Sequence, residues 1–149
     1  MQIYINSIQK AKDLEEAKAR YVKLISAYAE LKDYTFFNSK ISQAQKQSLN
    51  LAQKSYEELF LPLKKGFNIA LDEKGKELDS KDFSQLLDSK AVISFFIAGA
   101  YGFSENFLKN CDFTLSLSKL TLAHSLAKLV LLEQIYRGFC IIKKHPYHK

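Results

Sequence analysis

The sequence contains no tryptophan, one methionine and only two cysteines among its 149 residues. The cysteines, Cys111 and Cys140, are too few for a disulfide framework, so we expect free thiols in a reducing compartment. The first residues, MQIYINSIQKAKDLEE, do not place a basic segment before a long apolar run, as a signal peptide does. No apolar run reaches the roughly 20 residues of a membrane-spanning helix. We therefore expect a soluble, cytoplasmic protein without a membrane partner.

Glycine and proline are also scarce, with five and two residues respectively. No segment has the composition of a flexible linker, and we find no internal repeat or low-complexity stretch. The chain has the length of one ordinary domain. Its 47% hydrophobic and 13% aromatic residues are enough to form a sizeable core, which excludes a disordered chain. We expect a single domain over residues 1–149.

Basic residues outnumber acidic residues by 22 to 16, which gives a net charge of +6 and a pI of about 9.2. This charge favours an anionic partner, with RNA or DNA first. A lysine-rich surface that serves only solubility explains the same composition equally well.

The carboxyl-terminal tail is especially basic, because no acidic residue follows Glu133. Cationic and aromatic side chains occupy this tail: Arg137, Lys143, Lys144, His145, Tyr147, His148 and Lys149. Cations neutralise phosphates and aromatic rings stack on unpaired bases, so the tail predicts contact with RNA. The simpler alternative is a solvated basic terminus. Because no cysteine or acid lies near His145 and His148, we expect no metal site.

Strand-like and helical segments alternate along the chain. We expect strands at Gln2–Ile8, Thr35–Phe37, Phe67–Leu71, Val92–Ala98 and Phe113–Leu117. We expect helices at Asp13–Leu31, from a Ser42/Gln45 capping box to about Phe60, at Asp79–Leu87, from Ser104 to about Asn110, and from Leu122 to about Phe139. A polar turn at 72–76 is expected to close the third strand. This alternation predicts an α/β fold, with a mostly parallel sheet flanked by helices.

The last predicted helix is apolar on nearly all sides. Its apolar residues are Leu122, Leu126, Leu129, Val130, Leu131, Leu132, Ile135 and Tyr136. Such a helix is buried on more than one side. We expect one face to pack on the sheet and another on a second subunit, in a homodimer. The alternative is a central helix in a monomer.

Two predicted loops, together with the end of the strand at Leu71, are candidates for a ligand site. Gly99-Ala100-Tyr101-Gly102 follows a buried strand, and residues 117–122 follow the next one. Ligands of open α/β sheets bind at the carboxyl ends of strands, and glycines allow the backbone to approach them. The alternative is two ordinary connections, with Thr121 as a helix N-cap. His124 is either a polar residue at the helix end or part of the site.

Four segments, in order, resemble the motifs of one family: FIAGAYGFS at 96–104, LSLSKLTLAH at 115–124, EQIYR at 133–137 and HPYHK at 145–149. The family is RlmH, the pseudouridine N3-methyltransferases of large-subunit ribosomal RNA, which are of the SPOUT class. The resemblance implies an α/β knot, with a deep trefoil formed by the carboxyl-terminal segment. It also implies a homodimer that uses S-adenosyl-L-methionine.

The implied substrate is a pseudouridine in the intersubunit stem-loop of 23S RNA, methylated on assembled 70S ribosomes. The family usually has two glycines where this chain has Ala98-Gly99. That departure leaves an alternative, a non-catalytic RNA-binding dimer of the same fold.

The resemblance also places functional residues. Cofactor contacts are expected at Leu71, Ala98, Gly99, Gly102, Leu117, Ser118, Lys119, Leu120, Thr121 and Leu122. We assign catalysis to His148 as the proton acceptor, Tyr147 as the residue that stacks on the base, and Arg137. We assign RNA binding to Arg137, Lys143, Lys144, His145 and Lys149.

Overall fold

The computed structural model describes all 149 residues. Its elements are, in chain order, β1 (Gln2–Ile8), α1 (Glu15–Ile25), β2 (Glu30–Phe36), α2 (Ser39–Gln47), α3 (Leu49–Phe60), a short 3-10 helix (Leu61–Leu63), β3 (Phe67–Glu77), α4 (Ser80–Asp88), β4 (Val92–Ile97), α5 (Glu105–Lys109), β5 (Phe113–Ser116) and α6 (His124–Ile142). The five strands form one sheet in the order β2-β1-β4-β3-β5, and every pair is parallel. The predicted α/β fold with a parallel sheet is confirmed.

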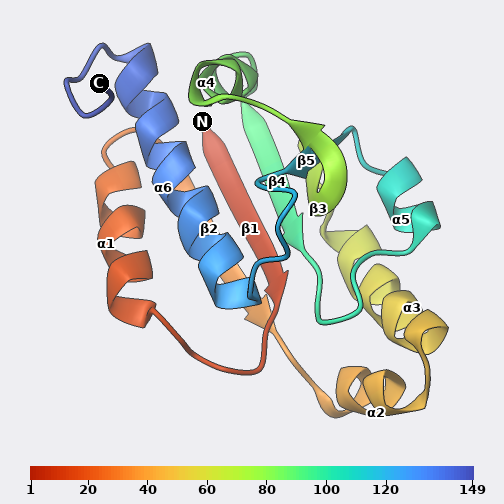
Figure 1. The fold of residues 1–149 in the computed structure, drawn as a ribbon. Helices are drawn as coiled ribbons and strands as arrows, with labels where there is room; N and C mark the ends of the chain where they lie inside the picture. The colour runs from red at the N-terminus through yellow and green to blue at the C-terminus, as the bar shows by residue number, and fades with distance from the viewer.

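The sheet is the middle of three layers. One core cluster joins it to α1, α4 and α6, and a second joins it to α2, α3 and α5. Figure 1 shows α6 running along the sheet beside α1, with α2, α3 and α5 on the other side. Alternation in β1 explains this division, because Ile3 and Ile5 face the first cluster whereas Ile8 faces the second. The central strand β4 is buried on both faces, as its unbroken apolar sequence predicts.

Two helices differ from their predicted bounds in the first half of the chain. The helix predicted to reach Leu31 ends at Ile25, because Glu30–Phe36 pairs with β1 as an edge strand. The predicted capping box at Ser42 and Gln45 is wrong. Asn38 caps α2 by accepting from the Ile41 amide at 2.8 Å, and Ser48 caps a separate helix, α3, by accepting from the Leu51 amide at 3.1 Å.

Two predicted features near the candidate loops are also corrected. The turn at 72–76 does not close β3, which continues to Glu77 after a register shift against β5 between Leu71 and Lys76. Thr121 is not an N-cap. Helix α6 begins at His124 after Ala123, without a side-chain cap, and the Thr121 hydroxyl instead donates to Glu73 at 2.6 Å. Cys111 and Cys140 are both free, as expected.

Helix α6 contains a buried charge among its apolar residues. The side chain of Lys128 is 1% exposed, and its ammonium group donates to Asp33 Oδ1 at 2.7 Å and to Thr35 Oγ1 at 2.9 Å. Both partners lie on β2, so the pair joins the helix to the edge strand. It compensates for the loss of water around the lysine, which is otherwise costly.

The connection from β5 to α6 crosses the sheet. Strand β5 lies at one edge, whereas α6 begins beside the ends of β1 and β4. Residues 117–123 therefore pass across the carboxyl ends of β3 and β4 (Figure 1). This path is consistent with the trefoil knot that the resemblance implies. None of the helices is both long and apolar enough to cross a membrane.

Candidate active site

Strands β4 and β5 end close together at one edge of the sheet, where β3 shifts register before it continues to Glu77. The register pairs Leu71 of β3 with Ile97 of β4 and with Leu115 of β5, so these residues form one row. The segments that follow this row contain the predicted cofactor residues. Leu71, Leu117 and Leu122 are half-buried there. The carboxyl edge of a parallel sheet is the usual place for a ligand in such folds.

The loop after β4 is a tight turn with two glycines, Gly99 and Gly102, which are required for different reasons. The Gly102 amide donates to the Gly99 carbonyl at 3.1 Å, and Gly102 has a φ of +72°, in the left-handed region that favours glycine. A Cβ on Gly102 would touch nothing within 4 Å, so its constraint is conformational. At Gly99 a Cβ would lie 2.5 Å from the hydroxyl of Tyr56, a fully buried residue of α3. Gly99 is thus constrained by core packing.

Ala98, which was expected to replace a glycine of the resembling motif, lies in the core. It is 6% exposed and belongs to the cluster under α2 and α3. Its extra methyl group is therefore accommodated by apolar neighbours.

Polar contacts within the segment 117–122 and to the end of β3 hold this segment in place. The Ser118 hydroxyl accepts from the Leu120 amide at 3.0 Å, and the Lys119 ammonium lies 3.8 Å from Glu77. Leu120 is 74% exposed, and Leu126 on the first turn of α6 is 41% exposed.

A pocket of about 330 Å³ opens beside this edge, at the ends of β1 and β4. Its lining includes Gln9, Gln45, Gly99, Ala100 and His124. The Oε1 atom of Gln9 is buried without a hydrogen-bond partner, while Nε2 donates to Ser125 and to the Ala11 carbonyl. Burial lowers the pKa of His124, which favours the neutral imidazole.

The sequence did not identify Gln9 or Gln45 as site residues, because Gln9 belongs to no motif and Gln45 was assigned to a capping box. The position of Gln9, directly after the first predicted strand, was the available signal.

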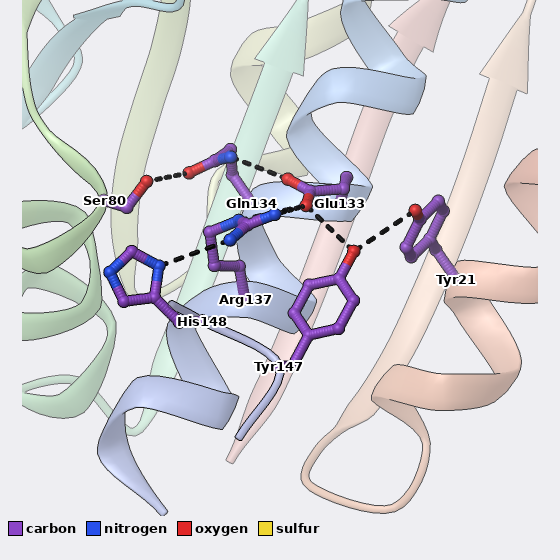
Figure 2. Close-up of polar contacts among 7 residues, drawn as sticks. All are labelled: Tyr21, Ser80, Glu133, Gln134, Arg137, Tyr147 and His148. Carbon is purple, nitrogen blue, oxygen red and sulfur yellow. Dashed lines mark hydrogen bonds and ion pairs between the residues drawn. The ribbon is translucent and has the colours of Figure 1, made fainter. Parts of the chain in front are cut away.

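The predicted catalytic residues lie close together around Glu133 of α6 (Figure 2). One carboxylate oxygen, Oε1, accepts from Arg137 Nη2 at 2.6 Å, from Arg137 Nε at 3.0 Å and from the Tyr147 hydroxyl at 3.0 Å. The guanidinium carbon of Arg137 also lies 4.8 Å from the centroid of the Tyr147 ring. The tail is therefore folded back on α6. Glu133 belongs to the EQIYR motif, but the sequence analysis assigned it no role. Its position four residues before Arg137 on a predicted helix indicates an ion pair between the two side chains.

The surroundings keep the Tyr147 phenol protonated and select one tautomer of a neutral His148 ring. Burial, with hydrogen bonds to Tyr21 and Glu133, raises the pKa of Tyr147 far above its ordinary value, so the phenol is neutral. Arg137 Nη1 lies 3.3 Å from His148 Nδ1 (Figure 2). A guanidinium group only donates, so Nδ1 is the acceptor and the proton of a neutral His148 ring is on Nε2.

The remaining tail residues face solvent. Lys143, Lys144, His145 and Lys149 are exposed, and none forms an ion pair. Nδ1 of His145 accepts from the Tyr147 amide at 3.2 Å. No group of three or more histidine, cysteine or acidic side chains is placed to hold a metal ion.

One chain does not bring the tail to the strand ends. Helix α6 starts at His124, beside the pocket, and Arg137 lies about 20 Å further along the helix, at roughly 1.5 Å per residue. The predicted catalytic and cofactor residues therefore form two separate groups within a single chain.

Comparison with known proteins places the chain among methyltransferases. Residues 1–148 match the family model described as predicted SPOUT methyltransferase. The chain is 56% identical, over 149 residues and the full length of both chains, to the ribosomal RNA large subunit methyltransferase H of Campylobacter jejuni subsp. jejuni serotype O:23/36 (strain 81-176). It is 52% identical to the protein of the same name from Campylobacter hominis, with 99% of each chain covered.

A solved structure shows the same fold at low identity. It is from Bacillus anthracis and is described as a candidate RNA methyltransferase. It aligns with a TM-score of 0.52 at 17% identity, covering 97% of this chain and 96% of that one.

Proposed function

Because the chain belongs to the SPOUT methyltransferase family, we propose that it methylates N3 of a pseudouridine in large-subunit ribosomal RNA. The expected substrate is the intersubunit stem-loop of 23S RNA in assembled 70S ribosomes. The observation that carries the proposal is the full-length similarity to proteins named ribosomal RNA large subunit methyltransferase H. Residues 1–149 would act as one domain, in the cytoplasm with the ribosomes.

The proposed methyl donor is S-adenosyl-L-methionine, which supplies an already activated methyl group, so the protein has mainly to orient the reactants. The strand ends fit such a ligand. Half-buried Leu71, Leu117 and Leu122 offer apolar surface to an adenine ring, and the backbone of 98–102 and 117–122 offers hydrogen-bonding groups.

We place the acceptor base between the strand ends of one subunit and the tail of its partner. The separation of about 20 Å along α6 supports this arrangement, because the folded tail does not reach the loops of its own chain. The exposed Leu120 and Leu126 supply apolar surface for the dimer contact beside the same loops. In such a homodimer, the exposed cations of the tail would bind RNA phosphates.

The proposed role of His148 requires a change of partner. N3 of pseudouridine carries a proton at neutral pH, and a group must accept it during methyl transfer. With Nδ1 turned to Arg137, neutral His148 presents an N–H at Nε2 and has no free acceptor nitrogen. His148 therefore has to leave Arg137 to act as the base, while Arg137 remains bound to Glu133 and its pKa stays raised by that carboxylate.

The non-catalytic alternative is less well supported. This alternative depends on Ala98, because a methyl group at that position would obstruct the cofactor. The burial of Ala98 in the α2–α3 cluster argues against obstruction.

The test is single-turnover methylation of 70S ribosomes that lack the modification, with titration of S-adenosylmethionine in parallel. We expect His148→Ala to reduce the rate by about 10²–10⁴, the usual contribution of a general base, and to leave cofactor affinity within about twofold. A loss of less than about tenfold would contradict the assignment of His148. No methylation of ribosomes, free subunits or free RNA by the wild type would contradict the function.

The partner contribution is tested by mixing. His148→Ala and a Gly102→Val variant, which strains the left-handed position, are each expected to be inactive. If the tail serves the partner's loops, mixed dimers regain activity that neither parent has. Failure to regain it, with mixed dimers verified by mass spectrometry, would assign both groups to the same subunit.

A further inference from the structure

One part of the sheet is not covered by a helix. The register pairs Tyr4 with Lys32 and Asn6 with Tyr34, so these residues share the face of Ile8 and Phe96. Helices α2 and α3 cover the carboxyl half of that face through Ile8 and Phe96. Tyr4, Lys32 and Tyr34 belong to neither core cluster, and Tyr34 is 44% exposed. We call Tyr4, Asn6, Lys32 and Tyr34, with Lys65 beside them, the β1–β2 face.

Lysines and aromatic rings alternate on the β1–β2 face. The ammonium nitrogens of Lys32 and Lys65 lie 5.7 Å and 4.8 Å from the centroid of the Tyr4 ring. The Tyr34 ring lies 6.4 Å from that of Phe36, at an angle of 33°. Lys32 is paired with Glu30 at 3.2 Å, whereas Lys65 forms no ion pair. The face therefore offers flat π surfaces next to a cation that is free to bind an anion.

An unsatisfied donor lies in the same row as Tyr34. Asn6 is 2% exposed, and its Nδ2 has no hydrogen-bond partner. A buried donor without a partner costs free energy. Asn6 is therefore buried beneath the β1–β2 face and is not itself a contact for a ligand.

We propose that the β1–β2 face binds an unpaired stretch of the RNA substrate. Aromatic side chains on an open sheet stack on bases, and lysines beside them bind the phosphates between those bases. A second copy of the chain is a poorer occupant, because an isologous contact would bring Lys32 and Lys65 against the same lysines. The inference rests on the proposed RNA substrate and adds a contact surface outside the methyl-transfer site. Tyr4 lies about 16 Å from Gln9 along β1, at roughly 3.3 Å per residue, so the β1–β2 face is separate from the pocket at the strand ends.

The test compares two substitutions of Tyr34 that differ in the ring alone. Affinity for a fluorescent 12-nucleotide single-stranded oligouridylate is measured by anisotropy. Tyr34→Leu removes stacking but keeps an apolar side chain, and we expect Kd to rise roughly tenfold. Tyr34→Phe keeps the ring, and we expect Kd within about twofold of the wild-type value. Equal affinities for the leucine and phenylalanine variants would overturn the proposal.

The lysines are tested by salt dependence. The double variant Lys32→Ala/Lys65→Ala is expected to reduce the slope of log K against log salt by about 1.4, since each phosphate contact to a single strand contributes roughly 0.7. The control is Lys23→Ala/Lys81→Ala, a pair of exposed lysines on α1 and α4, which cover the opposite face. An equal change in both pairs would mean non-specific attraction and would contradict a built surface.

Two further measurements test RNA binding by the β1–β2 face separately from the proposed methyltransferase activity. Sedimentation of Tyr34→Leu without RNA reports the oligomeric state, and a change there would assign the face to a protein contact instead. Ribosome methylation by the wild type tests the proposed function by itself. Normal methylation with unaltered RNA binding by every variant would refute only the β1–β2 face. Absent methylation with ring-dependent RNA binding would refute only the enzyme.

Discussion

Replacement of Gly99 by alanine separates two reasons for a glycine in the loop after β4. If the glycine serves only the approach of a ligand, Gly99→Ala folds normally and loses cofactor affinity. The structure gives a different reason. The new Cβ would lie 2.5 Å from the Tyr56 hydroxyl and 2.6 Å from the adjoining ring carbon. Tyr56 is fully buried and its hydroxyl donates to Gln45, so the ring has little freedom to move.

The expected cost follows from these contacts. Overpacking of a well-packed core costs about 1–3 kcal/mol, and loss of the Tyr56–Gln45 hydrogen bond adds about 1 kcal/mol. We therefore expect Gly99→Ala to lower the free energy of unfolding by about 3 kcal/mol. For a chain of this length, that corresponds to a fall in Tm of roughly 6–12 °C.

The assay is urea unfolding at one fixed protein concentration, for a double-mutant cycle with Tyr56→Phe. Removal of the hydroxyl should cost about 1 kcal/mol in the wild type but little in the Gly99→Ala variant, where the clash has already broken the Tyr56–Gln45 hydrogen bond. Effects that add within about 0.5 kcal/mol would refute the packing explanation. So would a Gly99→Ala protein of normal stability that no longer binds S-adenosylmethionine.

Two other substitutions follow from burial near the same edge. Ala98→Gly should leave the affinity for S-adenosylmethionine within about twofold while lowering stability by roughly 1 kcal/mol, through a lost buried methyl group and a more flexible backbone; calorimetry and urea unfolding measure the two effects. Burial lowers the pKa of His124 below its ordinary 6.5, so the unfolded chain takes up this proton first as the pH falls. Stability is then lost between 6.5 and the lower folded pKa, and His124→Gln should lose less stability than the wild type between about pH 7.5 and 5.5; equal losses would contradict the burial effect.

Periodicity located most elements of this fold but not all of their ends. The strands at Gln2–Ile8 and from Val92 matched, because most of their buried positions carry isoleucine or phenylalanine. The helix predicted to Leu31 stopped at Ile25, because residues 30–36 gain more by pairing with β1 than by continuing a helix. Ser42 and Gln45 fitted a capping box in sequence, yet Asn38 and Ser48, which are equally good caps, hold the real helix starts. Local signals of similar strength compete, and tertiary contacts decide among them.

The sequence predicts the part of the site that consists of loops directly after strands. It does not predict contacts between residues far apart in the chain. The carboxyl ends of parallel strands lie at the same edge of a sheet, so the sequence could predict that the loops after β4 and β5 lie close to Leu71. The folding of Tyr147 onto Glu133 depends on how a tail returns to a helix, which has no periodic pattern. Gln9 and the uncovered β1–β2 face depend on which part of the sheet α2 and α3 leave open. No single segment of the sequence encodes that.

The buried pair of Lys128 and Asp33 restricts how this chain can change over evolutionary time. Loss of either residue alone leaves the other without its partner, and for Lys128 that partner is the main compensation for complete burial. Two apolar residues at both positions are often tolerated in other proteins, but each single step toward them passes through a less stable protein. The two positions are therefore expected to be inherited as a unit, either kept together or replaced together. A family in which α6 and β2 carry this pair would show it as correlated substitution between residues 95 positions apart in sequence.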